Sequence, residues 1–284
     1  MYIVHMSDTH NGKAGTNQRF DLLLADLQSY PGLDLADCIV VHSGDLLKDA
    51  TPEYRRQALD SLRRLKNVVN RIYLCPGNHD CGDFWSVSKE KSEHFKQSFA
   101  EYIFHDQPHE FPVLHKLDDD HMLIGLDTNE AEVDNWLFNF GAEGRLGDSQ
   151  CQKLHGMLQN PELQNKKILI NLHHHPFLYR FNAVPIKNNF RKWLFFTMKK
   201  LTRRFRRMKD SKVFLELIQN RVDAIFFGHK HEGLDCSSES QKYGVSLALD
   251  AGSTTESDNM SDYMRYRVID LNDLSYKTRS VKYR

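Results

Sequence analysis

The stretch YLCPGNHDCGDF, residues 73–84, shows in miniature how this chain is built. An apolar run typical of a β-strand ends at Pro76, and the sequence GNHD, residues 77–80, follows it without a spacer. Gly and Asn favour tight turns, so the stretch taken alone is also compatible with an ordinary turn. A neutral amide, an imidazole and a carboxylate placed directly after a strand are, however, residue types that a catalytic or metal site needs.

Four other predicted strands also end in side chains that can bind a metal. They are residues 1–6, 37–43, 167–172 and 223–227, followed in turn by Asp8-Thr9-His10, Gly44-Asp45, His173-His174-His175 and Gly228-His229-Lys230-His231. Each stretch taken alone can also be interpreted as an ordinary turn, as a surface loop or as a chance combination of residues. In open α/β sheets, ligands collect beyond the carboxyl ends of the strands, so we expect all five stretches to converge at one rim.

The rest of the pattern predicts an α/β core. Helical spacing is found in residues 17–30, 52–66, 86–104 and 148–159, and further strands are expected at 68–75, 113–117, 121–126, 243–250, 263–270 and 275–282. Thr51 and Pro52 form a good N-cap and N1 pair, and Asp148 or Ser149 is expected to cap the last helix. The early strands are short apolar runs separated by helices, which predicts strands buried on both faces. The last three strands lack intervening helices, which favours a mixed sheet or a sandwich of two sheets.

The composition is that of a soluble globular protein. The 284 residues are 40% hydrophobic and 27% charged, an ordinary balance. No apolar run is long enough for a transmembrane helix, and the N-terminus lacks the basic and apolar regions of a secretory signal. The five cysteines are odd in number and scattered, which favours reduced thiols. We therefore expect a cytoplasmic protein.

The order of the five stretches resembles that of the calcineurin-like metallophosphoesterases, in particular their bacterial phosphodiesterase branch. That family carries D-x-H, G-D, G-N-H-D, H and G-H-x-H in this order, and the resemblance spans roughly residues 1–254. It implies an α/β fold with a layered β-sandwich flanked by helices, in a single domain over residues 1–284. It also implies a phosphoester hydrolase with two divalent or mixed-valent transition metal ions and an anionic phosphoester substrate.

The chemistry of the residues agrees with a two-metal site. Two cations roughly 3.5–4 Å apart can hold phosphoryl oxygens and generate a nucleophile from bound water. Mixed carboxylate, imidazole and amide ligands suit Mn, Fe or Zn better than Ca, which prefers oxygen ligands. A carboxylate has to bridge two like charges, and Asp45 is the natural candidate.

Individual roles follow from the resemblance. The first metal would take Asp8, His10, Asp45 and His231, and the second would take Asp45, Asn78, His229 and one histidine of residues 173–175. The family ligand ends a strand shortly before a proline, which favours His173 and leaves His174 as the alternative. His79 would face the substrate and protonate the leaving oxygen, and Asp80 would orient its imidazole.

The net charge of zero hides a strongly basic segment. Residues 185–212 contain eleven Lys or Arg and one acidic residue, which leaves 27 basic and 37 acidic residues in the rest of the chain. Within residues 188–210, apolar side chains recur at spacings of three and four, so a helix would place them on one stripe. They are Phe190, Trp193, Leu194, Met198, Leu201, Phe205 and Met208. Most of the cations, Arg203 and Arg204 among them, fall on the remaining arc, and we expect a basic amphipathic insertion at about 185–212.

Three interpretations of this insertion stay open. It can be a helix packed on the core with a solvated basic face. It can be a peripheral membrane helix, with the apolar stripe in lipid and the cations on anionic headgroups of the inner face. A grip on nucleic acid explains the charge, but not the apolar stripe unless that stripe packs on the core. Because the segment directly follows residues 173–176, we expect it to lie beside or over the metal site as a lid.

These observations favour a hydrolase of an amphiphilic phosphoester, lipid-linked or nucleotide-lipid, at a membrane surface. A soluble 3′,5′-cyclic-nucleotide phosphodiesterase is the first alternative, and a nucleic-acid-processing or nucleic-acid-binding protein is the second. The remaining histidines are interpreted as structural (His5 and His42) or as surface residues (His105, His109, His115, His121 and His155). Residues 250–254 either lie near the site or form a plain turn.

Overall fold

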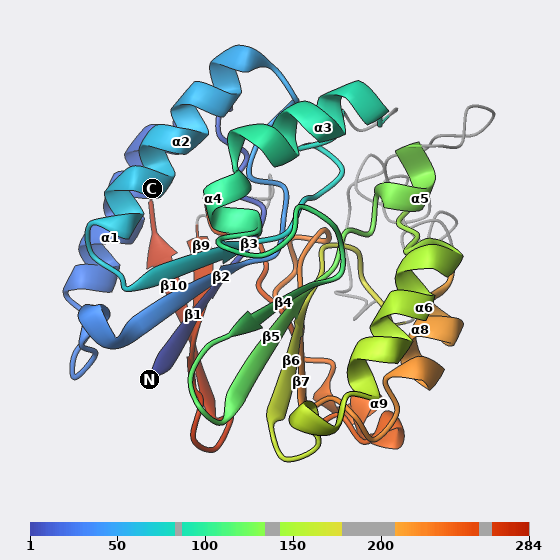
Figure 1. Cartoon of the computed structure of the whole chain (residues 1–284). Coiled ribbons are helices and arrows are strands. Elements are labelled where there is room, and N and C mark those ends of the chain that lie inside the picture. Colours follow the sequence, from blue (N-terminus) through green and yellow to red (C-terminus); the bar gives the residue numbers. More distant parts are fainter. Residues whose placement is uncertain (83–86, 134–142, 178–207, 256–262, 284) are drawn as a thin grey trace, which may run out of the picture.

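Two stacked sheets form the centre of the molecule. The computed structural model describes residues 1–82, 87–133, 143–177, 208–255 and 263–283. Within them, two five-stranded sheets stack face to face and helices lie on both outer sides (Figure 1). The expected α/β fold, a layered β-sandwich flanked by helices, is therefore confirmed.

The first sheet has the strand order β10-β9-β1-β2-β3. Its strands are β1 (Tyr2–Met6), β2 (Cys38–His42), β3 (Arg71–Leu74), β9 (Tyr263–Asp270) and β10 (Tyr276–Lys282). β1, β2 and β3 run parallel, whereas β9 is antiparallel to both β1 and β10. The carboxyl ends of the three parallel strands therefore lie at one edge of the sheet.

The second sheet has the order β4-β5-β6-β7-β8. Its strands are β4 (Val113–Lys116), β5 (His121–Gly125), β6 (Lys167–Asn171), β7 (Ala224–Phe227) and β8 (Leu247–Asp250). β4 is antiparallel to β5, and β5 to β8 run parallel. Four carboxyl ends therefore share a second edge, and it meets the edge of the first sheet.

The helices cover the two outer faces. Those of the first sheet are α1 (Thr16–Gln28), α2 (Pro52–Lys66), α3 (Lys89–Ser98) and α4 (Ala100–Ile103). Those that follow strands of the second sheet are α5 (Glu130–Val133), α6 (Gly147–Leu158), α8 (Ser211–Leu217) and α9 (Ser237–Ser240). Short 3₁₀ helices occupy Leu35–Asp37, Pro161–Leu163 and Gln241–Tyr243.

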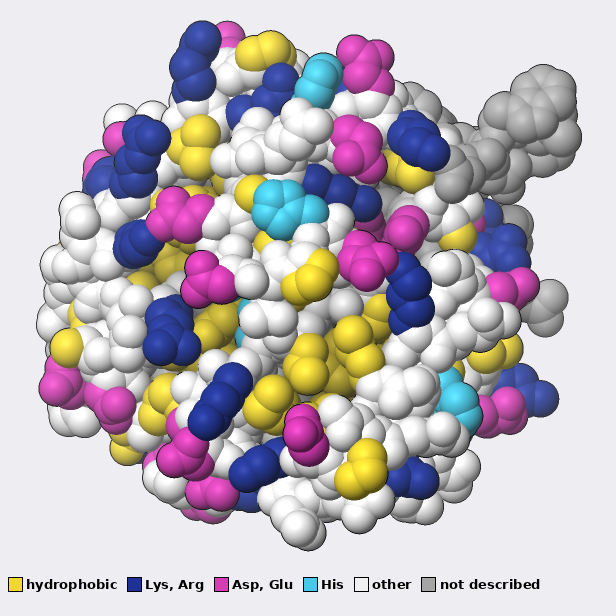
Figure 2. All heavy atoms as spheres, in the orientation of Figure 1, with side chains coloured by type: hydrophobic (Ala, Val, Ile, Leu, Met, Phe, Trp, Pro, Cys, Tyr) yellow, Lys and Arg dark blue, Asp and Glu magenta, His cyan; other side chains and the backbone are white. Residues whose placement is uncertain are grey.

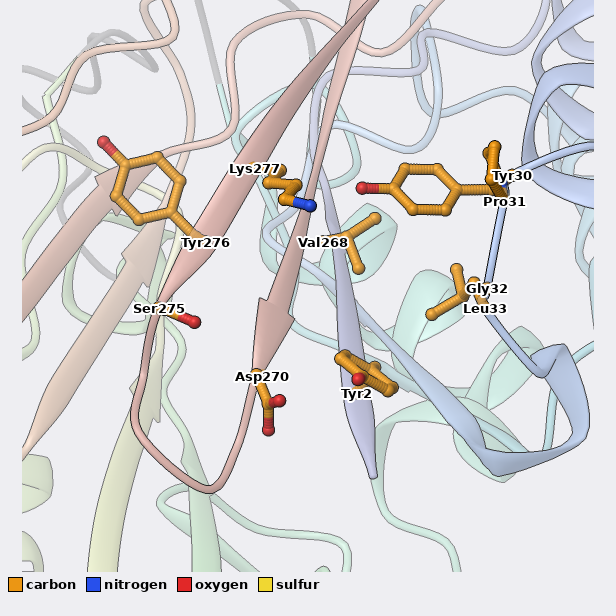
Figure 3. Close-up of a pocket in the computed structure, with 10 residues that line it drawn as sticks. All are labelled: Tyr2, Tyr30, Pro31, Gly32, Leu33, Val268, Asp270, Ser275, Tyr276 and Lys277. Carbon is orange, nitrogen blue, oxygen red and sulfur yellow. The ribbon is translucent and has the colours of Figure 1, made fainter.

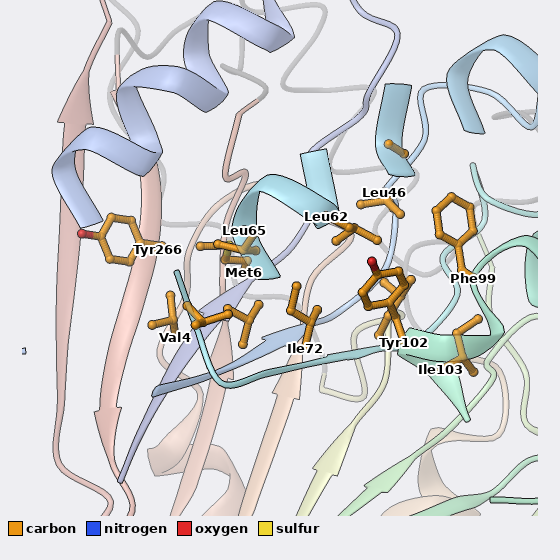
Figure 4. Close-up of a cluster of buried hydrophobic side chains, with 14 of the residues drawn as sticks. Val4, Met6, Leu46, Leu62, Leu65, Ile72, Phe99, Tyr102, Ile103 and Tyr266 are labelled. Carbon is orange, nitrogen blue, oxygen red and sulfur yellow. The ribbon is translucent and has the colours of Figure 1, made fainter. Parts of the chain in front are cut away.

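Strand β1 shows why the parallel strands are mostly apolar. Val4 and Met6 point into the cluster beneath α1 and α2, together with Leu62 and Leu65 (Figure 4). Ile3 points the other way, into the cluster between the two sheets. Successive side chains of a strand face opposite sides, so a strand that is covered on both faces is mostly apolar on both. His5 is the exception in β1, and its Nε2 lies 2.9 Å from the Ser43 hydroxyl oxygen.

Most of the predicted elements are confirmed, with some differences. The strand expected at 243–250 is limited to Leu247–Asp250, because Gln241–Tyr243 form a 3₁₀ helix. Residues 86–104 were expected as one helix, whereas α3 and α4 are separated at Phe99. The expected N-cap of α6, Asp148 or Ser149, is wrong because the helix begins at Gly147. The backbone N–H groups of Leu146 and Gly147 donate to the Asp210 carboxylate at 3.0 and 2.9 Å, a partner distant in sequence.

Two histidines expected at the surface are instead buried. His115 is 5% exposed, and its Nε2 lies 3.1 Å from the carbonyl oxygen of Ile103. His121 is 7% exposed, and its two ring nitrogens lie 2.8 Å from Asp118 and 2.9 Å from the Leu271 carbonyl oxygen. Both interpretations were wrong because nearby acceptors satisfy these rings inside the protein.

None of the described helices has the length and apolar character needed to cross a membrane.

Candidate metal centre

The loops after β1, β2, β3, β6 and β7 meet where the two sheet edges come together. The loop after β1 is hydrogen-bonded to the loop after β2, since the N–H of Asp8 donates to the Gly44 carbonyl at 3.0 Å. The N–H of His229, after β7, donates to the Asp8 carboxylate at 3.0 Å. This last bond joins the two sheets directly at the site.

Many residues of this centre have a left-handed backbone. Among the described non-glycine residues with positive φ are Asp8 (53°), His10 (45°), Asp45 (52°), His229 (77°) and His231 (58°). This region is sparsely populated for side chains of this size and costs on the order of 1–3 kcal/mol per residue. The loops thus turn sharply at the residues that we interpret as ligands, and each turn aims a side chain inward.

Two motif glycines allow the loops to approach this closely. A Cβ atom at Gly77 would collide with the Asp45 carboxylate and backbone. A Cβ atom at Gly228 would collide with the side chains of Ser7 and Asp8. The glycines in G-N-H-D and G-H-x-H are therefore required by contact with the first-sheet loops.

One group of side chains consists of Asp8, His10 and His231. His231 Nε2 lies 3.0 Å from Asp8 Oδ1 and 3.2 Å from His10 Nε2. Asp8 is fully buried, and its Oδ1 also lies 3.9 Å from His10 Nε2. A buried carboxylate oxygen facing two imidazole nitrogens fits a cation held between them.

A second group consists of Asn78, His173 and His229. Asn78 Oδ1 lies 3.2 Å from His173 Nε2 and 3.1 Å from His229 Nδ1. His173 Nδ1 faces the Ser43 carbonyl at 2.7 Å, so it donates there and Nε2 is directed at the group. This geometry favours His173 over His174 as the ligand next to Asn78.

Asp45 lies between the two groups. Its Oδ2 is 3.9 Å from His10 Nε2 and 3.3 Å from His173 Nε2. Its Oδ1 accepts the backbone N–H of His79 at 2.9 Å, which fixes the carboxylate. One carboxylate oxygen therefore faces nitrogen donors of both groups.

Comparison with known proteins identifies the family to which the chain belongs. The family model described as calcineurin-like phosphoesterase matches residues 1–233. The chain belongs to the calcineurin-like phosphoesterases. Members of this family depend on dinuclear metal centres, and this phosphoesterase is a metal-dependent phosphoester hydrolase whose His and Asp clusters can bind metals.

Solved structures share the fold of this phosphoesterase at low identity. A dimetal phosphatase from Danio rerio is 13% identical with a TM-score of 0.62, and the match covers 100% of this chain and 99% of that chain. A putative 5′-nucleotidase from Staphylococcus aureus is 13% identical with a TM-score of 0.54, covering 99% of this chain and 53% of that chain. No curated protein matched the sequence. These likenesses show the fold and leave the substrate to be inferred from the site.

The electrostatics of the phosphoesterase centre suit metal binding. Burial alone would raise the pKa of Asp45, but the imidazoles of His173, His79 and His10 hold it well below its usual range. Burial lowers the pKa of His10 and of His229 well below the ordinary value, so both rings are neutral, as metal ligands must be. Burial opposes protonation of His173 too, but the Asp45 carboxylate outweighs it and raises the pKa to about 9.

The structure corrects the role expected for Asp80. Its carboxylate accepts the backbone N–H groups of Leu46, Leu47 and Gly77, at 3.2, 2.8 and 2.8 Å. The imidazole of His79 is held instead by the Lys48 carbonyl, 2.7 Å from Nδ1. Asp80 does not orient the His79 ring because its oxygens fasten the G-N-H-D loop to the loop after β2.

Residues after β8 also support the centre. The Ser253 hydroxyl donates to the Asp8 carbonyl at 3.0 Å, and the Thr254 hydroxyl accepts the N–H of Ser7 at 3.0 Å. Of the two interpretations of residues 250–254, the structure supports a place beside the site. They brace the backbone that carries Asp8.

Sequence reasoning missed the turn after β5. Thr128 Oγ1 lies 2.7 Å from His174 Nδ1, and the Asn129 side chain donates to the Pro76 carbonyl at 3.2 Å. Asp127 anchors the turn, with an oxygen 2.9 Å from Lys96 Nζ. The signal was present, since Asp127-Thr128-Asn129 follows a predicted strand as the other stretches do.

A cavity of about 310 Å³ lies away from this centre. Tyr2, Tyr30, Leu33, Val268 and Lys277 are among its lining residues (Figure 3). Tyr2 begins β1, whereas Asp8 follows the other end of that strand. None of the proposed ligands lines this cavity, so we do not interpret it as the catalytic site.

The proposed lid falls almost wholly outside the described residues. This applies to Phe190, Trp193, Leu194, Met198, Leu201, Arg203, Arg204 and Phe205. Met208, the last residue of the expected apolar stripe, belongs to the described residues. It is fully buried in the core of the second sheet. Its N–H donates to the His175 carbonyl at 3.2 Å. At this end of the stripe, Met208 therefore packs inside the protein, as the core-packed interpretation expects.

Proposed function

We propose that the centre holds two metal ions that share Asp45. Asp8, His10 and His231 complete the first position, and Asn78, His173 and His229 complete the second. The observation that supports this most directly is the position of Asp45 Oδ2, which faces His10 on one side and His173 on the other. The donors favour Mn, Fe or Zn, since imidazoles and carboxylates are mixed at both positions.

The bound ions would polarise the phosphoryl oxygens and lower the pKa of a coordinated water. His79 is the residue that delivers a proton to the leaving oxygen. Its Nδ1–H donates to the Lys48 carbonyl, so its Nε2 carries the transferable proton.

For the substrate we propose an amphiphilic phosphoester met at an anionic membrane surface. The support comes from the sequence of residues 185–212, whose excess of basic over acidic residues, eleven to one, accompanies an apolar stripe. Both flanks of residues 178–207 are at the centre, because Met208 is hydrogen-bonded to His175. We propose one domain over residues 1–284, with this insertion as a lid on the inner face of the membrane.

The face shown in Figure 2 gives no support to a nucleic-acid substrate. On the face shown in Figure 2, Lys and Arg side chains are interspersed with Asp and Glu. A protein that grips a phosphate backbone typically gathers its cations into one patch or stripe. The described residues on that face form no such stripe.

A substrate panel tests the proposal. The purified enzyme, reconstituted with Mn, would be given bis-p-nitrophenyl phosphate, 3′,5′-cyclic nucleotides, phospholipid vesicles and DNA. We expect hydrolysis of the small diester and preference for the lipid phosphoester. Preference for cyclic nucleotides would instead establish the soluble phosphodiesterase, and preference for DNA the nucleic-acid enzyme. No metal-stimulated hydrolysis of any phosphoester would contradict the two-metal assignment.

A further inference from the structure

Three imidazoles meet at the second metal position. One ring nitrogen from each of His173, His174 and His229 lies within 4.8 Å of the other two. The ring centroids are 4.5 Å apart for His174 and His229, and 5.0 Å apart for His173 and His174. The rings are inclined to one another by 49° and 81°, so they are not stacked.

The ring of His174 is held as firmly as that of His173. Its Nδ1 lies 2.7 Å from the hydroxyl oxygen of Thr128, and both residues are fully buried. Gly144 also packs closely on this side chain, since a Cβ atom there would collide with the imidazole. A histidine ligand typically has its second nitrogen fixed by a hydrogen bond, which sets the direction of the first.

The turn that carries Thr128 is itself rigid. The Asn129 N–H donates to the Asp127 carboxylate at 2.8 Å, and the Asp127 N–H donates to Gln150 at 3.0 Å. The Thr128 carbonyl accepts the N–H of Arg145 at 2.7 Å. The hydroxyl is therefore placed by backbone contacts on both sides, which suits a residue that must orient a ligand.

We propose that His174 is an additional ligand of the second metal, bound through Nε2, and that Thr128 is its positioning residue. The inference rests on the proposed two-metal function. It makes the second position richer in nitrogen than the first: three imidazoles with an amide and the shared carboxylate, against two imidazoles with two carboxylates. Such a donor set selects metals that accept imidazole, Zn or Fe or Co, over Mg and Ca.

Cobalt titration of the metal-free protein tests this assignment. The absorption of bound Co²⁺ in the visible range and the metal content per chain would be followed for wild type, His174→Gly and Thr128→Val. His175→Gly is the matched control, because that neighbouring ring is also buried but packs on Phe177 and Phe227. Melting temperatures establish that each variant is folded.

We expect the wild-type protein to bind two equivalents of Co²⁺ per chain. His174→Gly should keep the first equivalent and bind the second at least about 100-fold more weakly, and added imidazole should restore it. Thr128→Val should weaken the second about 10-fold, the scale expected for a partner of a ligating histidine. The His175 variant should bind both equivalents normally.

Each contrary result has a distinct meaning. If His174→Gly binds two equivalents of Co²⁺ with wild-type affinity, the inference is overturned while the two-metal function stays intact. If His174→Gly does not fold, the inference is overturned when Thr128→Val binds the second equivalent of Co²⁺ with unchanged affinity. A wild type that cannot take a second equivalent would refute the two-metal proposal and this inference with it.

Discussion

The two sheets contribute different chemistry to the same centre. Among the ligands that we propose, the loops of the first sheet carry the oxygen donors Asp8, Asp45 and Asn78, together with the imidazole of His10. The loops of the second sheet supply only imidazoles, namely His173, His174, His229 and His231. A nitrogen-rich edge and an oxygen-rich edge therefore face each other, and neither contains the mixed ligand set of either proposed position.

This division makes the centre a consequence of sheet stacking. Ile3 of the first sheet and Leu169 of the second lie in the apolar cluster that holds the sheets together. The N–H of His229 then bonds to Asp8 across the junction. Packing in the interior thus sets the distance between the oxygen and nitrogen donors at the rim.

The largest effect is expected from Asp45, the residue that faces both groups. Asp45→Asn removes the negative charge that allows two cations to lie close together. The variant should lose most of both metals and nearly all hydrolysis, measured as metal content per purified chain and turnover of bis-p-nitrophenyl phosphate. A variant with two metals and near-normal turnover would show that Asp45 does not bridge.

Paired variants sharpen the grouping of ligands. His10→Gln and His229→Gln should each reduce the metal content from two per chain to one, because they belong to different groups. The double variant His10→Gln/His229→Gln should bind almost none, whereas His10→Gln/His231→Gln should still hold one. Equal metal contents in the two double variants would break the division into two positions.

His79 gives a smaller and separable effect. It comes from the oxygen-rich edge but is assigned to proton transfer, so His79→Ala should keep both metals and lose about 10²–10⁴-fold in rate. The loss should be least with p-nitrophenol, a leaving group that hardly needs a proton. His79 also lies in one group of possible ligands with His10 and Asp45. Loss of metal in the variant would therefore reassign His79 as a ligand.

The fold could be predicted well because its signals are local. Apolar runs, helical spacing and the Thr51 cap each lie within a few residues of one another. The cap of α6 could not be predicted, since Asp210 reaches Leu146 from 64 residues away. The burial of His115 and His121 was missed for the same reason, because their partners Ile103 and Leu271 come from other elements.

The residues of the candidate site could be predicted from the sequence, but the hydrogen bonds that hold them in place could not. The stretches at strand ends predicted which residues meet. Asp80 was assigned to His79 because the two are adjacent in sequence, yet its oxygens are held by Leu46, Leu47 and Gly77. Thr128 was not considered, since Asp-Thr-Asn alone does not distinguish a supporting turn from an ordinary one.

The smallest expected effect concerns the basic insertion, which we propose to act as a lid at a membrane surface. The wild-type protein should bind vesicles of anionic lipid, since each nearby Lys or Arg contributes about 1 kcal/mol. Added salt should weaken the binding without abolishing it, because burial of the apolar stripe is not screened. Co-sedimentation at two salt concentrations measures both contributions.

Trp193→Ser with Phe205→Ser separates the three interpretations of the insertion. A membrane lid predicts several-fold weaker vesicle binding and lipid turnover, with hydrolysis of a small diester unchanged. Leu22→Ser and Val213→Ser are matched controls, because these apolar side chains are exposed by 43% and 54% elsewhere on the surface. If the insertion is instead a helix packed on the core, where Met208 already packs, the double variant should have a lower melting temperature and lose every activity in parallel. Binding of DNA or RNA in place of vesicles would indicate a nucleic-acid grip, and no vesicle binding by wild type at low salt would rule out the membrane surface. The outcome therefore decides whether the anions that the insertion meets belong to a lipid surface, to a nucleic acid or to neither.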